Sequence, residues 1–546
     1  MRRTIQLDPL AAKLHQDLLA EAESILTRRP PEHSIDDGHR LLRESRLALK
    51  QISILSWAWR FTKDERYLKR AVTELGAICA MKDWNTVHFL DTAEMAVAAA
   101  IGYDWLHDQL TLQQRTMCEQ AIVDKALRPA RAHYDGKQWW TDGRNNWGQV
   151  CGSGIAVAAI AIQGKDDGLS MGLIRDGLDL LKKCERFYAP DGVYPEGPGY
   201  WHYGTIYHTK LLAACQTLGH PVSIPDDLKR SGVSMMHMHG PSRKPFNFSD
   251  GKAYPSGKSS AQAWIATHFN DAYQQTSVRE VIERALDPKQ NQLKHKTSPL
   301  TLLWLPTRPD KSESLPLNAV MHGEQSTAVF RSHWGADASW LAIKGGTPHG
   351  GHGHMDVGSF CYDAHGMRWI HDLGGDNYNM PGYFHGDRFQ YYRLQNRSHN
   401  TLEIDNSLQN PKSKPCPIIA SDTIGKPYAT LDLTEAYSEQ AKAVIRTARF
   451  DPKTGAVTIH DKVTKPRGIV TWRIITDADC CINGDKVILS KQGKSIQLQR
   501  LSMDGKWRVT NAKPPQKIEN PNEGFRVVSL TLPKSENVMI EVGIRP

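Results

Sequence analysis

Apolar residues in the first half of the chain recur at every third or fourth position. This spacing, which holds from about residue 8 to residue 290, is typical of helices with one buried face. Pro and Gly residues separate the periodic stretches, as at Pro30 and Pro31. The pattern predicts roughly ten or more helices joined by short links, packed as pairs in an incomplete ring or as a plain bundle. The clearest helical stretches are Leu10–Thr27, Leu41–Phe61, Tyr67–Met81 and Thr92–Leu106.

After about residue 315 the pattern changes to short runs rich in β-branched and aromatic residues, separated by turn-forming pairs such as Gly345-Gly346. Such runs predict the strands of an antiparallel β-sandwich. A proline-rich segment between Pro299 and Pro316 is the expected linker. We therefore predict a multidomain α+β protein, with a helical domain over residues 1–310 and a β domain over residues 311–546. The clearest strand candidates are Thr327–Arg331, Trp340–Lys344, Ala456–His460 and Arg526–Leu532.

Composition narrows the class of protein. With 546 residues, 40% of them hydrophobic and 23% charged, the chain can bury large cores in two or three domains. It has no run of eighteen apolar residues, so we expect no membrane span. The start, Met1-Arg2-Arg3, lacks the apolar stretch of a signal peptide. We expect a periplasmic or secreted bacterial protein whose signal peptide is absent from this sequence, or else a cytoplasmic one.

The net charge of +9 indicates an acidic partner. No block of Lys and Arg resembles a nucleic-acid-binding arm, and no zinc-finger spacing occurs, so we expect no nucleic acid. The 15 Trp and 17 Tyr residues favour a carbohydrate, because sugar rings stack on aromatic side chains. An anionic polysaccharide is the partner that fits both features. The pattern does not indicate an oligomeric state.

The densest group of chemically active residues is the segment from His349 to Asp356, in which three His and one Asp alternate with Gly. In an extended chain alternate side chains share a face, so His352, His354 and Asp356 can project together. A strand is expected to follow over Val357–Tyr362. The alternative is a flexible polar loop.

Two further residues extend this group. Asp372 and His399 each lie close to an expected strand, and two imidazoles with a carboxylate suit a zinc-like divalent ion. The spacing matches no short metal-binding signature.

The helical half contains two polar segments. In the first, Arg144–Gln149, the pair Asn145-Asn146 precedes an Ala-rich helix, which it could simply cap. The second, Asp191–Tyr203, is a turn rich in Gly and Pro that leads into a helix carrying Tyr200 and Tyr203. Aromatic residues at this spacing usually form core, but here Glu196 and His202 accompany them.

Taken together, these segments resemble the heparinase II/III-like polysaccharide lyases, and the resemblance covers most of the chain. It rests on four segments in the family's order: Asn145–Gly148, Glu196–Tyr203, His352–Asp356 and Ser398–Thr401. The family's fold, an incomplete N-terminal (α/α) toroid followed by an antiparallel β-sandwich, is therefore expected here. The implied activity is cleavage of uronate-containing polysaccharides by β-elimination.

The resemblance implies three catalytic residues. Asn146 would neutralise the substrate carboxylate, Tyr200 would act as general acid and in some members also as base, and His352 would be the base or its partner. A structural divalent metal, Zn²⁺ or alternatively Mn²⁺ or Ca²⁺, would be held by His354, Asp372 and His399. The residues expected to contact the substrate are Asn145, Trp147, Glu196, His202, Tyr203 and Arg393.

Two departures from the family pattern limit these assignments. Some relatives have His where this chain has Trp147, so the role of that His is absent here. The tyrosine that some alginate-cleaving members contribute from the β domain has no clear match, and Tyr383, Tyr391 and Tyr392 are the candidates. Glycosaminoglycans such as heparan sulfate, chondroitin sulfate and hyaluronan are the favoured substrates, with alginate or another uronan as the alternative.

A glycoside hydrolase on an (α/α) toroid is a rival interpretation, with Glu196 and Asp250 as its two carboxylates. It gives the histidine segment no role. A non-catalytic glycan-binding protein is the remaining alternative.

Overall fold

The computed structural model describes residues 1–165, 168–253, 260–287, 298–309, 315–350, 352–384, 388–502 and 505–546. The chain divides into two compact units. The first comprises Met1–Arg186, His202–Asp226 and Gly257–Glu313, and the second comprises Phe187–Trp201, Asp227–Ser256 and Ser314–Pro546. The predicted domain boundary between residues 310 and 311 lies outside the described residues.

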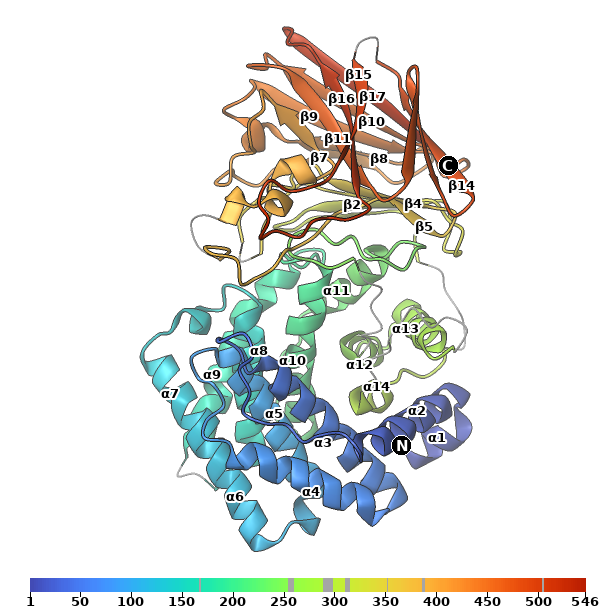
Figure 1. Cartoon of the computed structure of the whole chain (residues 1–546). Helices are drawn as coiled ribbons and strands as arrows, with labels where there is room; N and C mark the ends of the chain where they lie inside the picture. Colours follow the sequence, from blue (N-terminus) through green and yellow to red (C-terminus); the bar gives the residue numbers. More distant parts are fainter. Residues whose placement is uncertain are drawn as a thin grey trace. The chain divides into compact units, whose positions relative to one another are not determined.

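Helices occupy the first unit and the start of the second (Figure 1). The predicted helical stretches correspond to α2, α3, α4 and α5. Thr111 caps α6 through reciprocal hydrogen bonds with Gln114. The helices are α1 (Arg2–Leu7), α2 (Pro9–Ile25), α3 (Leu42–Thr62), α4 (Glu65–Ala80), α5 (Phe89–Leu106), α6 (Leu112–Ile122), α7 (Arg128–Asp135), α8 (Asn146–Ala161), α9 (Leu169–Cys184), α10 (Pro198–Thr217), α11 (Asp226–His237), α12 (Ser260–His268), α13 (Ala272–Ala285) and α14 (Pro299–Leu303).

Within the first unit, fully buried helices alternate with amphipathic ones. Helix α5 buries 15 of its 18 residues and packs between α3 and α8, whereas α4 buries 6 of 16, all on one face. Small residues allow the close packing of α5 on α8, since a side chain at Gly154 would meet the backbone of Ala93. Alternation of inner and outer helices is the arrangement expected of paired helices.

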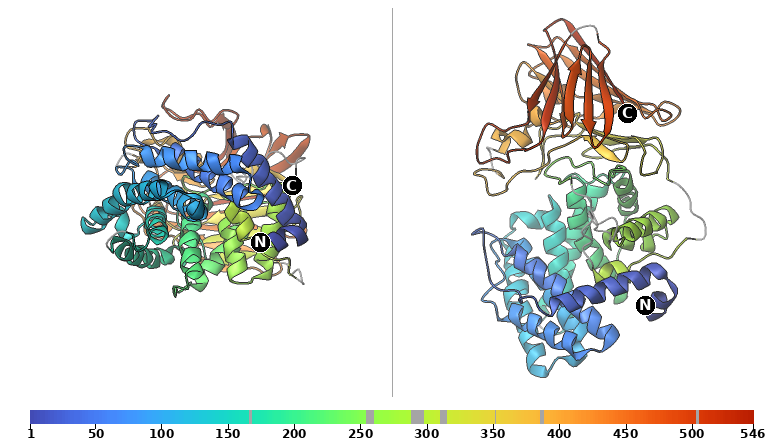
Figure 2. Two further views of the ribbon diagram at one scale, coloured as in Figure 1. Left: turned by 90° about the horizontal axis from the view of Figure 1, so that it is seen from below. Right: turned by 45° about the vertical axis from the view of Figure 1, so that its right-hand side comes forward.

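The strands of the second unit form three antiparallel sheets, as predicted. Their orders are β1-β2-β3-β4-β5, β12-β13-β14-β17-β10-β9-β8-β7 and β15-β16-β11-β6, and the right-hand view of Figure 2 shows the orange and red strands side by side. The strands are β1 (Ala319–Met321), β2 (Thr327–Arg331), β3 (Trp340–Lys344), β4 (Phe360–Ala364), β5 (Met367–Ile370), β6 (Leu402–Ile404), β7 (Ile418–Asp422), β8 (Tyr428–Asp432), β9 (Ala443–Phe450), β10 (Val457–Thr464), β11 (Val470–Thr476), β12 (Asp479–Asn483), β13 (Lys486–Lys491), β14 (Lys494–Arg500), β15 (Lys506–Asn511), β16 (Arg526–Leu532) and β17 (Asn537–Arg545).

The five-stranded sheet is buried on both faces. On β2, Ala328 and Phe330 face the core that this sheet shares with the other two sheets. The residue between them, Val329, packs instead with Phe246 and Phe248 in a second core. Strands β2, β3 and β4 therefore read as continuous apolar runs, whereas β9 and β10 alternate buried and half-exposed positions. This second core is the reason that residues 187–201 and 227–256 belong to the β unit.

A buried ion pair links the neighbouring strands β9 and β10 of the eight-stranded sheet, and breaking it should destabilise the protein. Arg446 and Asp461 form two hydrogen bonds of 2.7 and 2.8 Å with both side chains fully buried. Asp461→Ala leaves the guanidinium without its carboxylate, so we expect the free energy of unfolding in urea to fall by about 3 kcal/mol. Asp479, which pairs with Arg526 at the surface, is the control, and Asp479→Ala should cost no more than about 1 kcal/mol. Equal losses in the two variants would contradict this role of Arg446.

Acid should destabilise the fold through His237, the last residue of α11. Burial and the charge of Arg331 lower the pKa of His237 to about 3, so between this value and the ordinary pKa of about 6.5 only the unfolded chain binds the proton. The free energy of unfolding should therefore fall by up to about 1.4 kcal/mol per pH unit as the pH drops below 6.5. His237→Gln should remove this contribution from urea unfolding measured between pH 5 and 7. An unchanged pH dependence in the variant would refute it.

No helix among the residues that the structure describes is long and apolar enough to cross a membrane.

Candidate active site

The described residues of the histidine segment, 349–350 and 352–356, lie between β3 and β4 and outside any strand. Strand β4 begins at Phe360, three residues later than predicted. Asp356 is held by other residues than the histidines: its Oδ1 accepts a 2.5 Å hydrogen bond from Lys344 Nζ, and its Oδ2 accepts one of 3.2 Å from the backbone of Ser249. The prediction that Asp356 shares a face with His352 and His354 is wrong, because this segment turns and is not extended. Asp356 fixes the loop to its neighbours.

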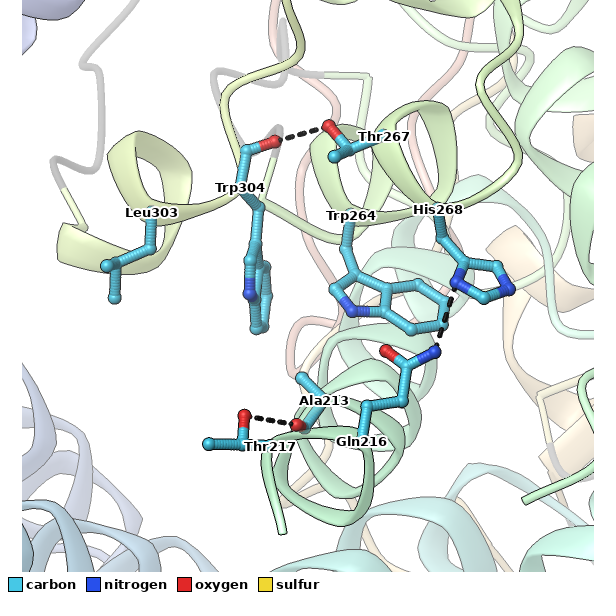
Figure 3. A pocket seen from close by; sticks show the side chains of 8 residues that line it. All are labelled: Ala213, Gln216, Thr217, Trp264, Thr267, His268, Leu303 and Trp304. Atoms are coloured by element: carbon cyan, nitrogen blue, oxygen red, sulfur yellow. Dashed lines mark hydrogen bonds between the residues drawn. The ribbon is translucent and has the colours of Figure 1, made fainter. Parts of the chain in front are cut away.

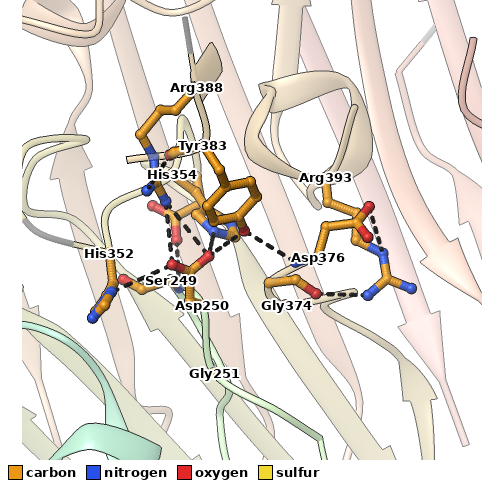
Figure 4. A network of polar contacts seen from close by, with 12 residues as sticks. Ser249, Asp250, Gly251, His352, His354, Gly374, Asp376, Tyr383, Arg388 and Arg393 are labelled. Atoms are coloured by element: carbon orange, nitrogen blue, oxygen red, sulfur yellow. Dashed lines mark hydrogen bonds and ion pairs between the residues drawn. The ribbon is translucent and has the colours of Figure 1, made fainter. Parts of the chain in front are cut away.

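The carboxylate of Asp250 is the centre of a buried polar network (Figure 4). Its Oδ1 accepts hydrogen bonds from Tyr383 at 2.7 Å and from His354 Nε2 at 2.9 Å. Its Oδ2 lies 3.4 Å from both Arg388 Nη2 and His352 Nδ1. Burial opposes ionisation of Asp250, but the hydrogen bond from His354 and the charges around it hold its pKa well below the ordinary value. Asp250 is therefore an anion that positions four side chains.

Local backbone geometry delivers Asp250 to this position. Ser249 has a positive φ of 59°, which turns the chain sharply after Phe248, a residue of the second core. Gly251 and Gly374 then meet so closely that a side chain at Gly374, where φ is +64°, would collide with the backbone of Gly251. The Asp250 segment and the Asp372–Gly375 segment are thereby held together.

Tyr200 stacks on His352. Their ring centroids are 3.9 Å apart and the ring planes differ by 18°. The hydroxyl of Tyr200 is hydrogen-bonded to that of Tyr378, and Glu196 Oε2 lies 3.7 Å from His352 Nε2. The two residues that the sequence predicted as acid and base are thus in direct contact.

Burial favours the uncharged form of both Tyr200 and His352, and it therefore shifts their pKa values in opposite directions. It lowers the pKa of His352 to about 4, although the charge of Asp250 opposes this shift. It raises the pKa of Tyr200 well above 10, and the negative charge of Asp250 acts in the same direction. At neutral pH, His352 is an unprotonated imidazole that can accept a proton, and Tyr200 is a phenol that can donate one.

The three predicted metal ligands lie in a line instead of around one point. His354 Nδ1 is 3.3 Å from His399 Nε2, and His399 Nδ1 is 2.8 Å from Asp372 Oδ2. Burial opposes a charge on His399, but Asp372 raises its pKa. His399 thus lies between His354 and Asp372 within hydrogen-bonding distance of both, while His354 donates to Asp250.

This line does not fit one ion held by all three side chains. Asp372 lies on the opposite side of the His399 ring from His354, so to bind the same ion it would have to leave His399 Nδ1. Across the described parts of the chain, no group of three or more His, Cys, Asp or Glu side chains is arranged to hold a metal ion. The predicted zinc site stays a prediction.

The remaining predicted residues of the helical unit form their own contacts. Asn145 caps α8 by accepting a 3.0 Å hydrogen bond from the backbone of Trp147, and the Asn146 side chain is buried. The indole of Trp147 lies against Trp139, with ring centroids 4.7 Å apart. Asn145 is therefore a helix cap, as its position before the Ala-rich helix suggested.

Tyr203 belongs to an ionic cluster in the helical unit, of which only Glu94 is fully buried. Its hydroxyl donates a 2.5 Å hydrogen bond to Glu94, which is also paired with Arg46 at 3.1 Å. The preceding residue in the sequence, His202, is buried. The part that Tyr203 and His202 play in binding substrate stays a prediction.

Arg393 is engaged by the protein itself. Its guanidinium donates to the backbone carbonyls of Leu373 and Gly375, at 3.2 and 2.7 Å, and to Asn522 at 2.8 Å. These contacts hold the segment that follows Asp372. Its predicted contact with substrate is untested.

Two central residues were not predicted in these roles. Asp250 was considered only for a hydrolase, and Tyr378 was not among the candidate tyrosines of the β domain. The signal for Asp250 was an acidic residue directly after the apolar alternation of Phe246 and Phe248. The signal for Tyr378 was weaker, since it is a single aromatic residue among polar neighbours.

Comparisons with known proteins agree with this architecture. Residues 325–536 match the family described as heparinase II/III-like, C-terminal. No curated protein sequence matches the chain. Among solved structures, the heparan sulfate lyase HepC of Pedobacter heparinus is similar over 99% of this chain and 83% of its own, with 12% identity and a TM-score of 0.63.

Two structures of heparinase III are similar as well. For the first, the similarity extends over 97% of this chain and 84% of the other, with 14% identity and a TM-score of 0.66. For the second, it extends over 95% of this chain and 79% of the other, with 11% identity and a TM-score of 0.65. At these identities the likeness shows the fold, and it confirms the predicted order of a helical toroid and a β domain. The chain therefore has the fold of the heparinase III structures, and its residues 325–536 are similar to the heparinase II/III-like C-terminal family.

Proposed function

We propose that the chain is a polysaccharide lyase that cleaves uronate-containing anionic polysaccharides by β-elimination. The heparinase II/III-like C-terminal domain and the heparinase III fold support a carbon–oxygen lyase. The observation that carries the mechanism is the stack of Tyr200 on His352, in which one ring can donate a proton and the other can accept one. Such a polymer is met outside the cytoplasm, so the proposal includes a periplasmic or secreted location.

The reaction needs a base and an acid. His352 removes the proton from C5 of the uronate, the C5–H electrons form the C4=C5 double bond, and the C4–O4 bond breaks. Tyr200 gives its proton to O4, which leaves as the new chain end. Proton exchange with water then restores His352 as the base and Tyr200 as the acid. Correctly placed acids and bases contribute about 10²–10⁴-fold each.

Removal of the C5 proton places negative charge on the uronate carboxylate. A hydrogen bond from Asn146 is the stabilising interaction that the family resemblance implies, worth about 3–4 kcal/mol by analogy with oxyanion holes. Asp250 contributes by holding His352, and no step of the mechanism depends on a metal ion.

A glycoside hydrolase that uses Glu196 and Asp250 is less well supported. Both carboxylates lie next to His352, but Asp250 accepts hydrogen bonds from Tyr383 and His354 and has a strongly lowered pKa. A general acid for hydrolysis needs a raised pKa. Asp250 cannot be that acid, and as the second carboxylate it would have to act with its Oδ1 already hydrogen-bonded to Tyr383 and His354.

Glycosaminoglycans, with heparan sulfate first, are the proposed substrates, since the similar structures include a heparan sulfate lyase. The test is incubation with heparan sulfate, chondroitin sulfate, hyaluronan and alginate, followed by ultraviolet absorbance. Elimination leaves a conjugated C4=C5 uronate that absorbs, whereas hydrolysis does not. We expect absorbance to rise with heparan sulfate. Chain shortening without absorbance would disprove elimination, and a rise with alginate alone would disprove the substrate class.

A further inference from the structure

The helical unit contains a pocket that takes no part in the proposed reaction. It has a volume of about 340 Å³ and lies where the end of α10 meets α12 and the end of α14 with the residue that follows it (Figure 3). Tyr200 is in the first turn of α10, whereas this pocket uses the last two turns. Its lining residues are Ala213, Gln216, Thr217, Trp264, Thr267, His268, Leu303 and Trp304.

Two indoles form the apolar part of the pocket. Trp264 is only 4% exposed, and its ring is parallel to that of His268, with an angle of 2° and a centroid separation of 4.8 Å. Trp304 is half-buried, and its side chain lies beside that of Trp264 along the pocket in Figure 3. Trp264 is almost fully buried and forms the base of the pocket, whereas the partly buried indole of Trp304 is a rigid surface on which the C–H face of a sugar ring can pack with little loss of side-chain entropy.

The rim of the pocket is polar, and its hydrogen-bonding capacity can be assigned. The Thr217 hydroxyl donates to the carbonyl of Ala213 at 2.8 Å, and the Thr267 hydroxyl donates to that of Trp304 at 2.9 Å. Both hydroxyl oxygens can therefore still accept a hydrogen bond. A ligand hydroxyl group could donate a hydrogen bond to either threonine oxygen.

His268 completes the rim as a donor. The amide nitrogen of Gln216 lies 3.1 Å from His268 Nδ1. Because the amide donates, Nδ1 accepts and Nε2 carries the proton. Burial lowers the pKa of His268, so the ring is neutral at pH 7.

From these contacts we infer that the pocket is a non-catalytic binding site for a neutral sugar ring. Its volume is at the lower end of the range of small-ligand pockets, about 300–1,000 Å³, and suits one pyranose. Its lining offers stacking surface, two hydroxyl acceptors, an amide and an imidazole donor, but no charged side chain. A uronate or a sulfated ring would lose hydration there without meeting a cation. The inference rests on the pocket alone and does not depend on the lyase activity.

The test is titration of the whole protein with two neutral disaccharides, cellobiose and N,N′-diacetylchitobiose, followed by tryptophan fluorescence and saturation-transfer NMR. We expect saturable binding of at least one of them, unaffected by an excess of digalacturonate. Thr217→Leu removes an acceptor and fills space, and should weaken binding at least about tenfold while cleavage of polysaccharide continues at the wild-type rate. Trp304→Ala should do the same by removing a stacking surface.

Leu218→Ala is the matched control, because Leu218 is the next residue, is 52% exposed and does not line the pocket. Its binding should equal that of the wild type. The inference is overturned if neither disaccharide binds, if digalacturonate displaces it, or if Thr217→Leu binds as the wild type does. Trp304 also packs on the helical core, so Thr217→Leu decides the matter if Trp304→Ala does not fold.

Discussion

Replacing Tyr200 by Phe is expected to lower kcat for polysaccharide cleavage by about 10²–10⁴-fold, with the fold intact. The phenol is the proposed source of the proton that O4 receives, and burial keeps it protonated at neutral pH. Phenylalanine preserves the ring that stacks on His352 and removes only the hydroxyl, which bonds to Tyr378. The measurement is the initial rate of ultraviolet absorbance on the best substrate of the four, together with urea unfolding.

Tyr67→Phe is the matched control. Tyr67 is likewise a tyrosine whose hydroxyl bonds to a side chain, that of Glu23, but it belongs to α4 and has no proposed part in the reaction. Its loss of a hydroxyl should leave kcat unchanged. If the kcat of Tyr200→Phe were within a few-fold of that of the wild type, Tyr200 would be excluded as the acid.

The periodic parts of the sequence predicted the fold well. Strands β2, β3 and β16 have the predicted bounds, because each is a short apolar run between turn residues. The start of β4 was wrong, since the apolar Val357 is buried in a loop that turns at Gly358, where φ is +82°. No local pattern could place residues 187–201 and 227–256 in the β unit, because the contacts responsible join Phe246 and Phe248 to β2 and β3.

The site was predictable only where residues cluster along the chain or match the family. Tyr200 and His352 came from such segments, and the structure stacks one on the other. Asp250 and Tyr378 are isolated in sequence, and their positions depend on long-range contacts. For the same reason the metal prediction counted suitable ligands, but only the geometry shows Asp372 and His354 on opposite sides of His399.

Asp250→Ala should impair stability and activity together. The substitution removes the carboxylate that faces Arg388, His352, His354 and Tyr383, all of which are buried. An unpaired buried charge and unsatisfied donors remain, which should lower the free energy of unfolding by about 3–5 kcal/mol. With His352 no longer held, kcat per folded molecule should fall by at least about tenfold, because small displacements of a base are costly.

Asp250→Asn removes the negative charge of the side chain but keeps its size and shape, so it tests the contribution of the charge. The amide keeps the size of the side chain, but its oxygen can accept from only some of the surrounding donors and its nitrogen opposes the others. We expect a smaller loss of stability than in Asp250→Ala but a similar loss of kcat, since positioning of His352 needs the anion. Asp477→Asn is the control: Asp477 pairs with His371 and Lys491 but is 34% exposed, so its neutralisation should cost about 1 kcal/mol or less and leave kcat unchanged. If Asp250→Asn retained wild-type turnover, Asp250 would hold the loops together without positioning the base.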